Sequence, residues 1–184
     1  MQTAPALEFY APKEIVLPDG APLRLRAIVP DDAPRLQAFV ARLSPQTLFL
    51  RTLVPMKTLS DRDARRLATV DCHRRMALIA TTGDGEDETI VGVARYATLP
   101  GDAADHAEIA IVVEDGYQGR SLGTVLLKEL AVYARAHGIA AFTAAISSEN
   151  ARVRYMIERT GLPTEIHNTG YGEQEVRILL RRQE

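Results

Sequence analysis

The order of apolar and polar residues along the chain changes period several times, and each period predicts one kind of secondary structure. An apolar residue at every second position, or a short continuous apolar run, is typical of a strand. Apolar residues three and four positions apart are typical of a helix. Strands are predicted over residues 14–17, 23–27, 76–81, 89–96, 109–113, 139–146 and 175–180. Helices are predicted from residue 31 to about 43, from 45 through 49, from 61 toward 70, from 122 to 137 and from 151 to about 160.

The order of these elements combines hairpins with helical crossovers in one sheet, which predicts an α/β (α+β) fold. We expect residues 1–20 to form an N-terminal arm and a hairpin strand. Residues 21–184 are expected to form a single domain, since 184 residues are enough to bury one hydrophobic core.

Composition and charge narrow the classes of function. With 46% hydrophobic and 25% charged residues, the chain has the make-up of an ordinary soluble globular protein. Its net charge of −2 gives no electrostatic reason to expect nucleic acid as a partner. No apolar run is long enough for a membrane span and the N-terminus lacks a secretory signal pattern, so we expect no membrane partner and a cytoplasmic location.

Cysteine and histidine usage argues against two further kinds of chemistry. Cys72 is the only cysteine, which excludes an intrachain disulfide, and we expect it to be a small, partly buried residue. The four histidines show no ligand spacing with one another or with Cys72, so we expect no metal site.

The stretch of residues 107–127 is the strongest pointer to function. Its apolar run Ile109–Val113 predicts a buried strand, and a helical period begins shortly after it. Gly116, Gly119 and Gly123 lie at the junction, where they allow positive φ angles and a close ligand. A strand that turns directly into a helix leaves free N–H groups and the positive end of the helix dipole at one point, which favours phosphate. The glycine spacing does not fit the dinucleotide fingerprint, and the Gly-Lys-Ser/Thr of a Walker loop is absent.

The turn contains Gln118-Gly-Arg-Ser-Leu-Gly123, which resembles the coenzyme A pyrophosphate loop of the GNAT superfamily of acyl-CoA N-acyltransferases, usually Gln/Arg-x-x-Gly-x-Gly/Ala. Ser121 departs from that pattern, because the family has its first motif glycine there. The resemblance extends over residues 23–180. It implies the GNAT fold, with a mixed, largely antiparallel sheet of about six to seven strands flanked by four or so helices, and it implies acetyl-CoA as the co-substrate.

The resemblance also implies a set of coenzyme contacts. In the GNAT fold the strand before the turn splays from its neighbour, so that pantetheine can pair with its backbone. The residues that match these positions and the phosphate-binding turn are Ile111, Val112, Val113, Gln118, Gly119, Arg120, Ser121, Leu122, Gly123, Thr124 and Asn150. Asn150 has a second interpretation of equal merit, since it is placed to cap the following helix.

Several segments carry a closer resemblance, namely Leu43–Arg51, Val70–Asp71 with Arg75–Ala77, Val91–Tyr96, Ala107–Glu108 and Asp115–Gly119. They are similar to bacterial protein lysine acetyltransferases of the Pat type. That similarity implies transfer of an acetyl group to a protein lysine, with an AMP-forming acyl-CoA synthetase as the acceptor. Two alternatives stay open: an acetyltransferase for small amines or antibiotics, and a non-catalytic acyl-CoA-binding module. Residues 43–70 should form an open groove for a protein acceptor and a closed polar pocket for a small amine. The sequence is compatible with a monomer or a homodimer.

Glu108 is the candidate catalytic residue. A lysine amine has an unperturbed pKa near 10.4, so freeing it at pH 7 costs about 4–5 kcal/mol and a nearby base is expected. In Pat-type enzymes the Ala-Glu at this position provides that base, and Glu108 matches it. We expect partial burial to raise its pKa toward a useful value. The alternative is a strand-end carboxylate that faces water or pairs with an arginine such as Arg95.

No general acid is evident. Many GNAT enzymes carry a tyrosine seven residues after the motif asparagine, and that position is Ile157 here. Tyr155 lies two residues earlier, about 200° around a helix, so we expect it to point elsewhere. A thiol with a pKa near 8.5 can leave as the thiolate without a dedicated acid.

Overall fold

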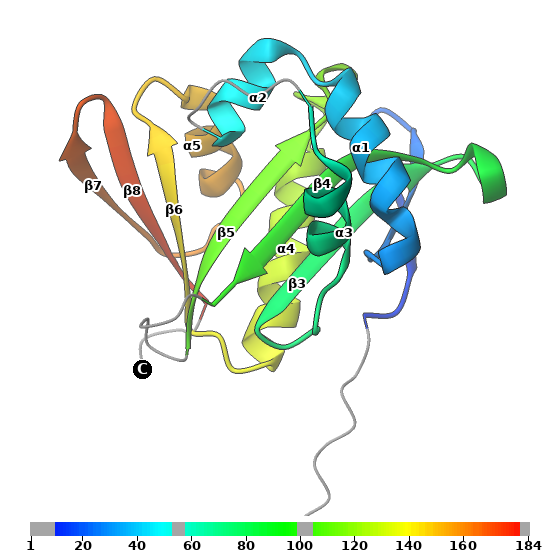
Figure 1. Ribbon diagram of the computed structural model, residues 1–184. Helices are drawn as coiled ribbons and strands as arrows, with labels where there is room; N and C mark the ends of the chain where they lie inside the picture. Colours follow the sequence, from blue (N-terminus) through cyan, green and yellow to red (C-terminus); the bar gives the residue numbers. More distant parts are fainter. Residues whose placement is uncertain (1–9, 53–57, 99–104, 181–184) are drawn as a thin grey trace, which may run out of the picture.

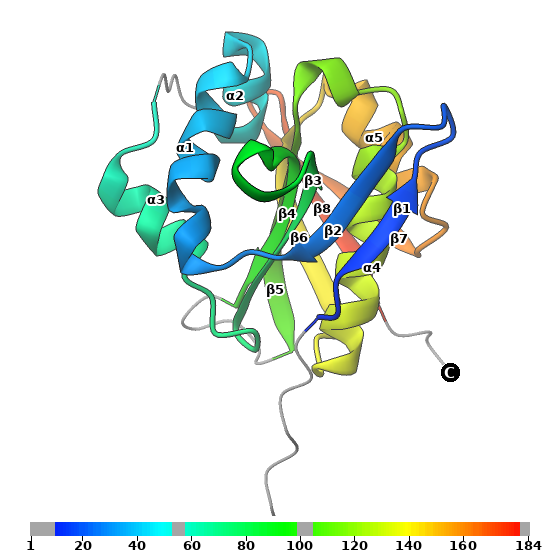
Figure 2. The same cartoon turned by 90° about the vertical axis from the view of Figure 1, so that its right-hand side faces the viewer.

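A computed structural model describes residues 10–52, 58–98 and 105–180, which form an eight-stranded sheet with helices on both faces (Figures 1 and 2). The strands are β1 Lys13–Val16, β2 Pro22–Ala27, β3 Arg75–Thr82, β4 Thr89–Ala97, β5 His106–Val113, β6 Ala141–Ser147, β7 Thr164–Gly170 and β8 Glu173–Leu179. The α-helices are α1 Ala33–Arg42, α2 Pro45–Thr52, α3 Asp61–Ala68, α4 Leu122–Ala136 and α5 Ala151–Glu158. Short 3₁₀ turns lie at η1 Pro30–Asp32, η2 Gly85–Asp87 and η3 Asp115–Tyr117.

The strand order is β1-β2-β3-β4-β5-β6-β8-β7, and every neighbouring pair is antiparallel except β5 and β6. This mixed sheet confirms the predicted fold class. The boundary predicted at residues 20 and 21 falls inside the β1–β2 hairpin, and both of these strands belong to the one sheet.

Two hydrophobic clusters hold the helices to the sheet. One packs α4, through Leu122, Leu126 and Leu130, against the face that carries Met76 and Phe142. The other packs α1 and its neighbours against the opposite face of the central strands. Because side chains alternate across a strand, residues next to one another in β3, β4 and β5 divide between the two clusters.

The prediction of about six to seven strands and four or so helices was slightly low. The additional strand is β7, which lies at the edge of the sheet and pairs only with β8. Its side chains are almost all exposed, so its sequence lacks the alternation of apolar and polar residues that reveals a half-buried strand. Backbone pairing with β8 alone defines it.

Smaller differences occur at element boundaries. The strand predicted from residue 139 begins at Ala141, because the N–H groups of Ala140 and Ala141 both donate to the carbonyl of Asp105 in the preceding connection. The helix predicted to run to about residue 160 ends at Glu158 and continues as a turn to Gly161. Within the described ranges, none of the helices has both the length and the apolar character needed to cross a bilayer.

Candidate active site

β5 and β6 separate within the sheet. They pair over only three residues, and the last pair joins Glu108 to Thr143. Beyond this point β5 continues along β4 and β6 continues along β8, so the two strands diverge (Figure 1). The splayed strand that the GNAT resemblance implied is therefore present, with Glu108 at the vertex of the opening.

The backbone groups of β5 alternate between β4 and this opening. The N–H group of Glu114 donates to the carbonyl of Val91 in β4 at 2.9 Å. In an antiparallel ladder the backbone groups two residues earlier, at Val112, then also face β4. Those of Ile111 and Val113 face the opening. Of the three predicted pantetheine contacts, Ile111 and Val113 turn their backbone groups toward the opening, where the carbonyl of Val113 accepts from Gln118, and Val112 is turned the other way.

The turn after β5 exposes a run of backbone amides. Gly119 has a φ of 74° and Ser121 a φ of 70°, both in the left-handed region, and α4 begins at the next residue. From Gly119 to Thr124, no N–H group makes a well-formed hydrogen bond to another residue in the part of the chain that the structure describes. The first bonded amide is that of Val125, which donates to the carbonyl of Ser121 at 3.1 Å. Consecutive free amides at the N-terminus of a 15-residue helix form an anion site.

The three glycines of this region have different roles. Gly119 supplies a positive φ, whereas Gly116 has an ordinary φ and open space where a Cβ would be. At Gly123 an added Cβ would lie 2.7 Å from the Sδ of Met156, so glycine there allows α5 to pack closely against the start of α4. Ser121 adopts the left-handed conformation that the family's motif glycine would favour, at a cost of about 1 kcal/mol.

Gln118 connects three elements at the mouth of the opening. Its side-chain amide donates to the carbonyl of Val113 and to the Oγ1 of Thr47 in α2, both at 3.0 Å. Its carbonyl oxygen accepts from the guanidinium of Arg152 in α5 at 2.6 Å. Thr47 was not assigned to the site by sequence reasoning, since no local pattern relates residues that are far apart in the chain.

The other predicted contacts of the turn act mainly through the backbone. The guanidinium of Arg120 binds the carboxylate of Asp19 and lies 4.7 Å from the ring of Tyr117, so its side chain is held away from the free amides. Leu122 is buried in the core, and it can offer a ligand only its N–H group. Thr124 is half-buried on the first turn of α4.

Asn150 caps α5. Its side-chain oxygen accepts from the N–H group of Val153 at 3.2 Å, and the residue is only 9% exposed. The capping interpretation is therefore present in the structure, and a coenzyme contact by Asn150 stays a prediction. Tyr155 is exposed and Ile157 is buried, so the two side chains point to different sides of α5, as expected from their spacing.

Asp115 fastens α2 to the turn. Its carboxylate accepts from the backbone N–H of Ser44 at 2.9 Å, from the hydroxyl of Ser44 at 2.7 Å and from the hydroxyl of Thr47 at 2.8 Å. Burial alone would raise the pKa of Asp115, but these hydrogen bonds outweigh it and lower the pKa. Leu43–Arg51 and Asp115–Gly119, two of the Pat-like segments, are therefore in direct contact.

Glu108 lies on the floor of a groove of about 190 Å³. The groove is lined by Arg66, Leu67, Thr69, Val70, Arg75, Met76, Arg95, Tyr96, Ala97, Glu108, Ile109 and Ala110. The expectation of partial burial was wrong, because Glu108 is exposed where β6 diverges from β5. The alternative of an Arg95 partner is not seen, since the Glu108 carboxylate has no hydrogen-bond or ion-pair partner among the described residues.

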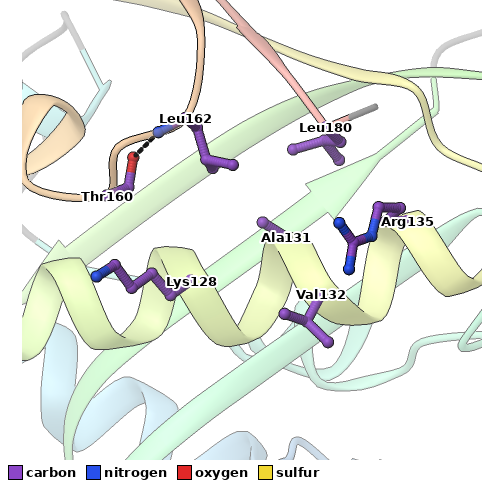
Figure 3. A pocket seen from close by; sticks show the side chains of 7 residues that line it. All are labelled: Lys128, Ala131, Val132, Arg135, Thr160, Leu162 and Leu180. Atoms are coloured by element: carbon purple, nitrogen blue, oxygen red, sulfur yellow. Dashed lines mark hydrogen bonds between the residues drawn. The ribbon is translucent and has the colours of Figure 1, made fainter. Parts of the chain in front are cut away.

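A second cavity of about 200 Å³ lies on the outer side of α4, away from Glu108 and the turn. Lys128, Ala131, Val132 and Arg135 line it from α4, and Thr160, Leu162 and Leu180 face them (Figure 3). It contains none of the predicted site residues. In the described ranges no group of three or more His, Cys, Asp or Glu side chains is placed to hold a metal ion.

The opened strand edge, the adjoining free amides and the carboxylate at the vertex lie along one line. β5 spans about 17 Å between Glu108 and Val113, at about 3.3 Å per residue. An extended ligand with phosphates at one end and a reactive group at the other fits this layout. The fold and the site together define the class of acyltransferases that use acyl-coenzyme A.

Comparisons with known proteins give the family. Residues 48–162 match the acetyltransferase (GNAT) family, so the chain belongs to that family and is an acetyl-CoA-dependent N-acetyltransferase. The acetyltransferase PA5475 of Pseudomonas aeruginosa is 30% identical over 138 residues, which cover 75% of this chain and 73% of that protein.

Two Pat proteins are also similar. The acetyltransferase Pat of Mycolicibacterium smegmatis is 28% identical over 156 residues, which cover 83% of this chain but only 45% of that protein. The crystal structure of the GNAT domain of S. lividans PAT superposes with a TM-score of 0.82 at 29% identity, covering 91% of this chain and 97% of that domain. The predicted resemblance to the GNAT superfamily and to Pat is confirmed.

Proposed function

We propose that this enzyme transfers the acetyl group of acetyl-CoA to the side-chain amine of a protein lysine, with Glu108 as the general base. The proposal rests mainly on the position of Glu108 in the fold. Its unpaired carboxylate lies at the vertex between β5 and β6, on the floor of a groove that is open to solvent.

The coenzyme would be held by the backbone of the chain. The free amides from Gly119 to Thr124 suit the pyrophosphate, since a helix N-terminus with unpaired N–H groups favours negative charge. The backbone groups of Ile111 and Val113 face the opening and suit the amides of pantetheine. Gln118 already donates to the carbonyl of Val113, so it would have to share or release that carbonyl when the coenzyme binds.

Glu108 would act on the incoming amine. A lysine that enters the groove presents its ammonium to the carboxylate, which removes one proton so that the neutral amine can attack the thioester carbonyl. The second proton leaves the nitrogen after the attack and passes to solvent or to the departing thiolate. The C–N bond forms, the C–S bond breaks and the coenzyme leaves as the thiolate. That thiolate needs no dedicated acid, because a thiol pKa near 8.5 is close to the pH of the reaction.

The size of the groove favours a protein side chain over a whole small molecule. Pockets that enclose small molecules have volumes of about 300–1,000 Å³. The volume at Glu108 is about 190 Å³, which is too small to enclose a whole small-molecule substrate beside the thioester. The likeness to Pat supports the same choice and suggests an AMP-forming acyl-CoA synthetase as the acceptor.

The test replaces the base and leaves the coenzyme site intact. In Glu108→Gln, we expect kcat to fall by about 10²–10⁴-fold, while coenzyme affinity measured by calorimetry changes little. Thiol release and the intact mass of a lysine-containing acceptor report turnover. Glu14→Gln is the matched control, because Glu14 is an exposed carboxylate on β1, at the edge of the sheet.

The outcomes distinguish the three functions. Full activity of Glu108→Gln across the pH range would exclude Glu108 as the base. Thiol release with small amines but with no protein or peptide lysine would indicate a small-molecule acetyltransferase. Coenzyme binding without turnover on any amine would indicate a binding module.

A further inference from the structure

A row of side chains crosses the sheet through Glu108. The strand registers place one residue from each of six neighbouring strands directly opposite the next, on the face that carries α3. In order from β3 to β7, the row is Arg75, Ala97, Glu108, Thr143, Arg177 and Glu165. Residues that oppose one another in a ladder point to the same face, so these side chains lie on one track.

Glu108 is in the middle of this row, with an arginine two strands away on each side. Neighbouring strands lie about 4.8 Å apart, so the backbones of Arg75 and Arg177 are each about 10 Å from that of Glu108. The residues between them, Ala97 and Thr143, are small. An extended peptide advances about 3.3 Å per residue and its side chains alternate between two faces, so the residues two and four positions from a lysine share its face, about 7 and 13 Å away along the chain.

The groove around Glu108 is positively charged. Its charged lining consists of Arg66, Arg75 and Arg95 against the single carboxylate of Glu108, although the whole chain has a net charge of −2. A lysine that approaches Glu108 therefore meets guanidinium groups of its own sign, although Asp63, 3.3 Å from Arg66, and Asp71, 3.6 Å from Arg75, offset part of their charge. An acceptor with carboxylates beside its lysine would offset this repulsion.

The backbone that carries Arg75 is held firmly. One carboxylate oxygen of Asp71 accepts from the N–H groups of His73 at 3.0 Å, Arg74 at 2.7 Å and Arg75 at 2.8 Å. The hydroxyl of Tyr96 donates to the carbonyl of His73 at 3.0 Å. Arg75 is thus presented on a preorganised loop, and this lowers the ordering cost of binding a ligand there.

Arg75 is also the more available of the two flanking arginines. Its Nε lies 3.6 Å from Asp71 and half of its side chain is exposed, at 51%, so this is a weak surface ion pair that an acceptor carboxylate can share. Arg177 contacts the ring of His106 at 2.7 Å and lies 3.9 Å from the carboxylate of Glu165. The Arg75 side therefore has the greater capacity for a new carboxylate.

We propose that the acceptor lysine is recognised together with an acidic residue two or four positions away, whose carboxylate binds Arg75 at the β3 end of the row. This inference rests on the proposed function, since it assigns the sequence context of the lysine acceptor for the same site. Arg66, on the facing wall of the groove, adds to the attraction.

The test compares short peptides with one central lysine. One peptide carries glutamate two and four positions before and after the lysine, and the matched peptide carries glutamine there. With the wild-type enzyme we expect the acidic peptide to have a KM lower by about two- to fivefold at low salt, with similar kcat, and the advantage to shrink at high salt. Because this comparison uses only the wild-type protein, it does not depend on the folding of any variant.

Variants then assign the effect to Arg75. Arg75→Gln should reduce the ratio of kcat/KM between the acidic and neutral peptides toward one, and Arg75→Glu should favour a peptide with arginine at the same positions. Arg24→Gln is the control, an exposed arginine on β2 away from the groove. Equal use of both peptides by the wild type would overturn this inference and leave the proposed function standing. Acetylation of neither peptide, with active transfer to small amines, would overturn both.

Discussion

The two halves of the site offer different kinds of chemical groups, backbone groups in one half and side chains in the other. On the proposed coenzyme side, the groups available to a ligand are backbone groups of the turn after β5 and of the β5 edge. On the acceptor side they are charged side chains, with Glu108 and Arg75 brought into one row by strands β3 to β5. A backbone site depends on local conformation, whereas a side-chain site depends on register between distant strands. Substitutions on the two sides should therefore affect different kinetic constants.

Gly123→Val is expected to have the largest effect, and that effect should be confined to the coenzyme side of the site. A Cβ at this position would lie 2.7 Å from the Sδ of Met156, and the additional methyl groups would crowd the start of α4. Overpacking of this kind costs about 1–3 kcal/mol. We expect the KM for acetyl-CoA to rise about tenfold or more, with little change in the KM for the acceptor, in steady-state assays. Gly116→Ala is the control, because Gly116 has space for a Cβ and should tolerate it.

Asp71→Ala should affect the acceptor side of the site, because Asp71 holds the backbone next to Arg75. The variant removes the carboxylate that accepts three backbone hydrogen bonds. We expect the free energy of unfolding to fall by about 1–2 kcal/mol. The KM for the lysine substrate should rise, and the affinity for the coenzyme should stay unchanged. Asp84→Ala is the control, because Asp84 is an exposed aspartate next to η2. A raised KM for acetyl-CoA instead would contradict the separation of the two sides.

Asp71 also makes the stability of the fold depend on pH. Burial by itself would raise the pKa of Asp71, but the hydrogen bonds from the N–H groups of Arg75, His73 and Arg74 outweigh it and lower the pKa. A carboxyl with a lowered pKa stabilises the fold above its unfolded pKa of about 3.9, and this stability is lost as pH falls through the folded pKa. Urea unfolding of wild type and Asp71→Ala should therefore converge as the pH is lowered below about 4.

Asp115→Ala tests the link between the two sides. Its carboxylate joins the N-terminus of α2 to the turn that precedes the free amides, and loss of such a cap costs about 1 kcal/mol. We expect moderate increases in the KM of both substrates. Ser44→Ala removes part of the same contact, so the double variant should show less than the sum of the two effects. Full additivity would mean that the contact does not couple the two sides.

The smallest effect is expected at Ser121. Its φ of 70° costs a non-glycine residue about 1 kcal/mol, and Ser121→Gly relieves that strain while it adds freedom to the unfolded chain. A net gain of about 0.5 kcal/mol corresponds to a rise in Tm of about 1–2 °C for a chain of this size. Calorimetry measures it directly, and a lower Tm would show that the serine side chain makes a compensating contribution.

Local sequence patterns were sufficient for the coenzyme side. The apolar run of β5, the glycines of the turn and the helical period of α4 are contiguous in the chain, so the strand, the turn and the helix could each be predicted from neighbouring residues. The cap at Asn150 was predicted for the same reason, and its side chain accepts the expected backbone hydrogen bond.

The acceptor side was determined by tertiary structure. Nothing near Glu108 in the sequence indicates that Arg75 and Arg177 lie on the same row, because a shift of one residue in any strand register would turn the side chain to the other face. The exposure of Glu108 follows from the divergence of β5 and β6, and the edge strand β7 exists through its pairing with β8. The sequence by itself determined the turn that can hold a phosphate, since its conformation depends on adjacent residues. Only the packed sheet decided which charged side chains surround Glu108, the proposed base, since that depends on pairing between strands far apart in the chain.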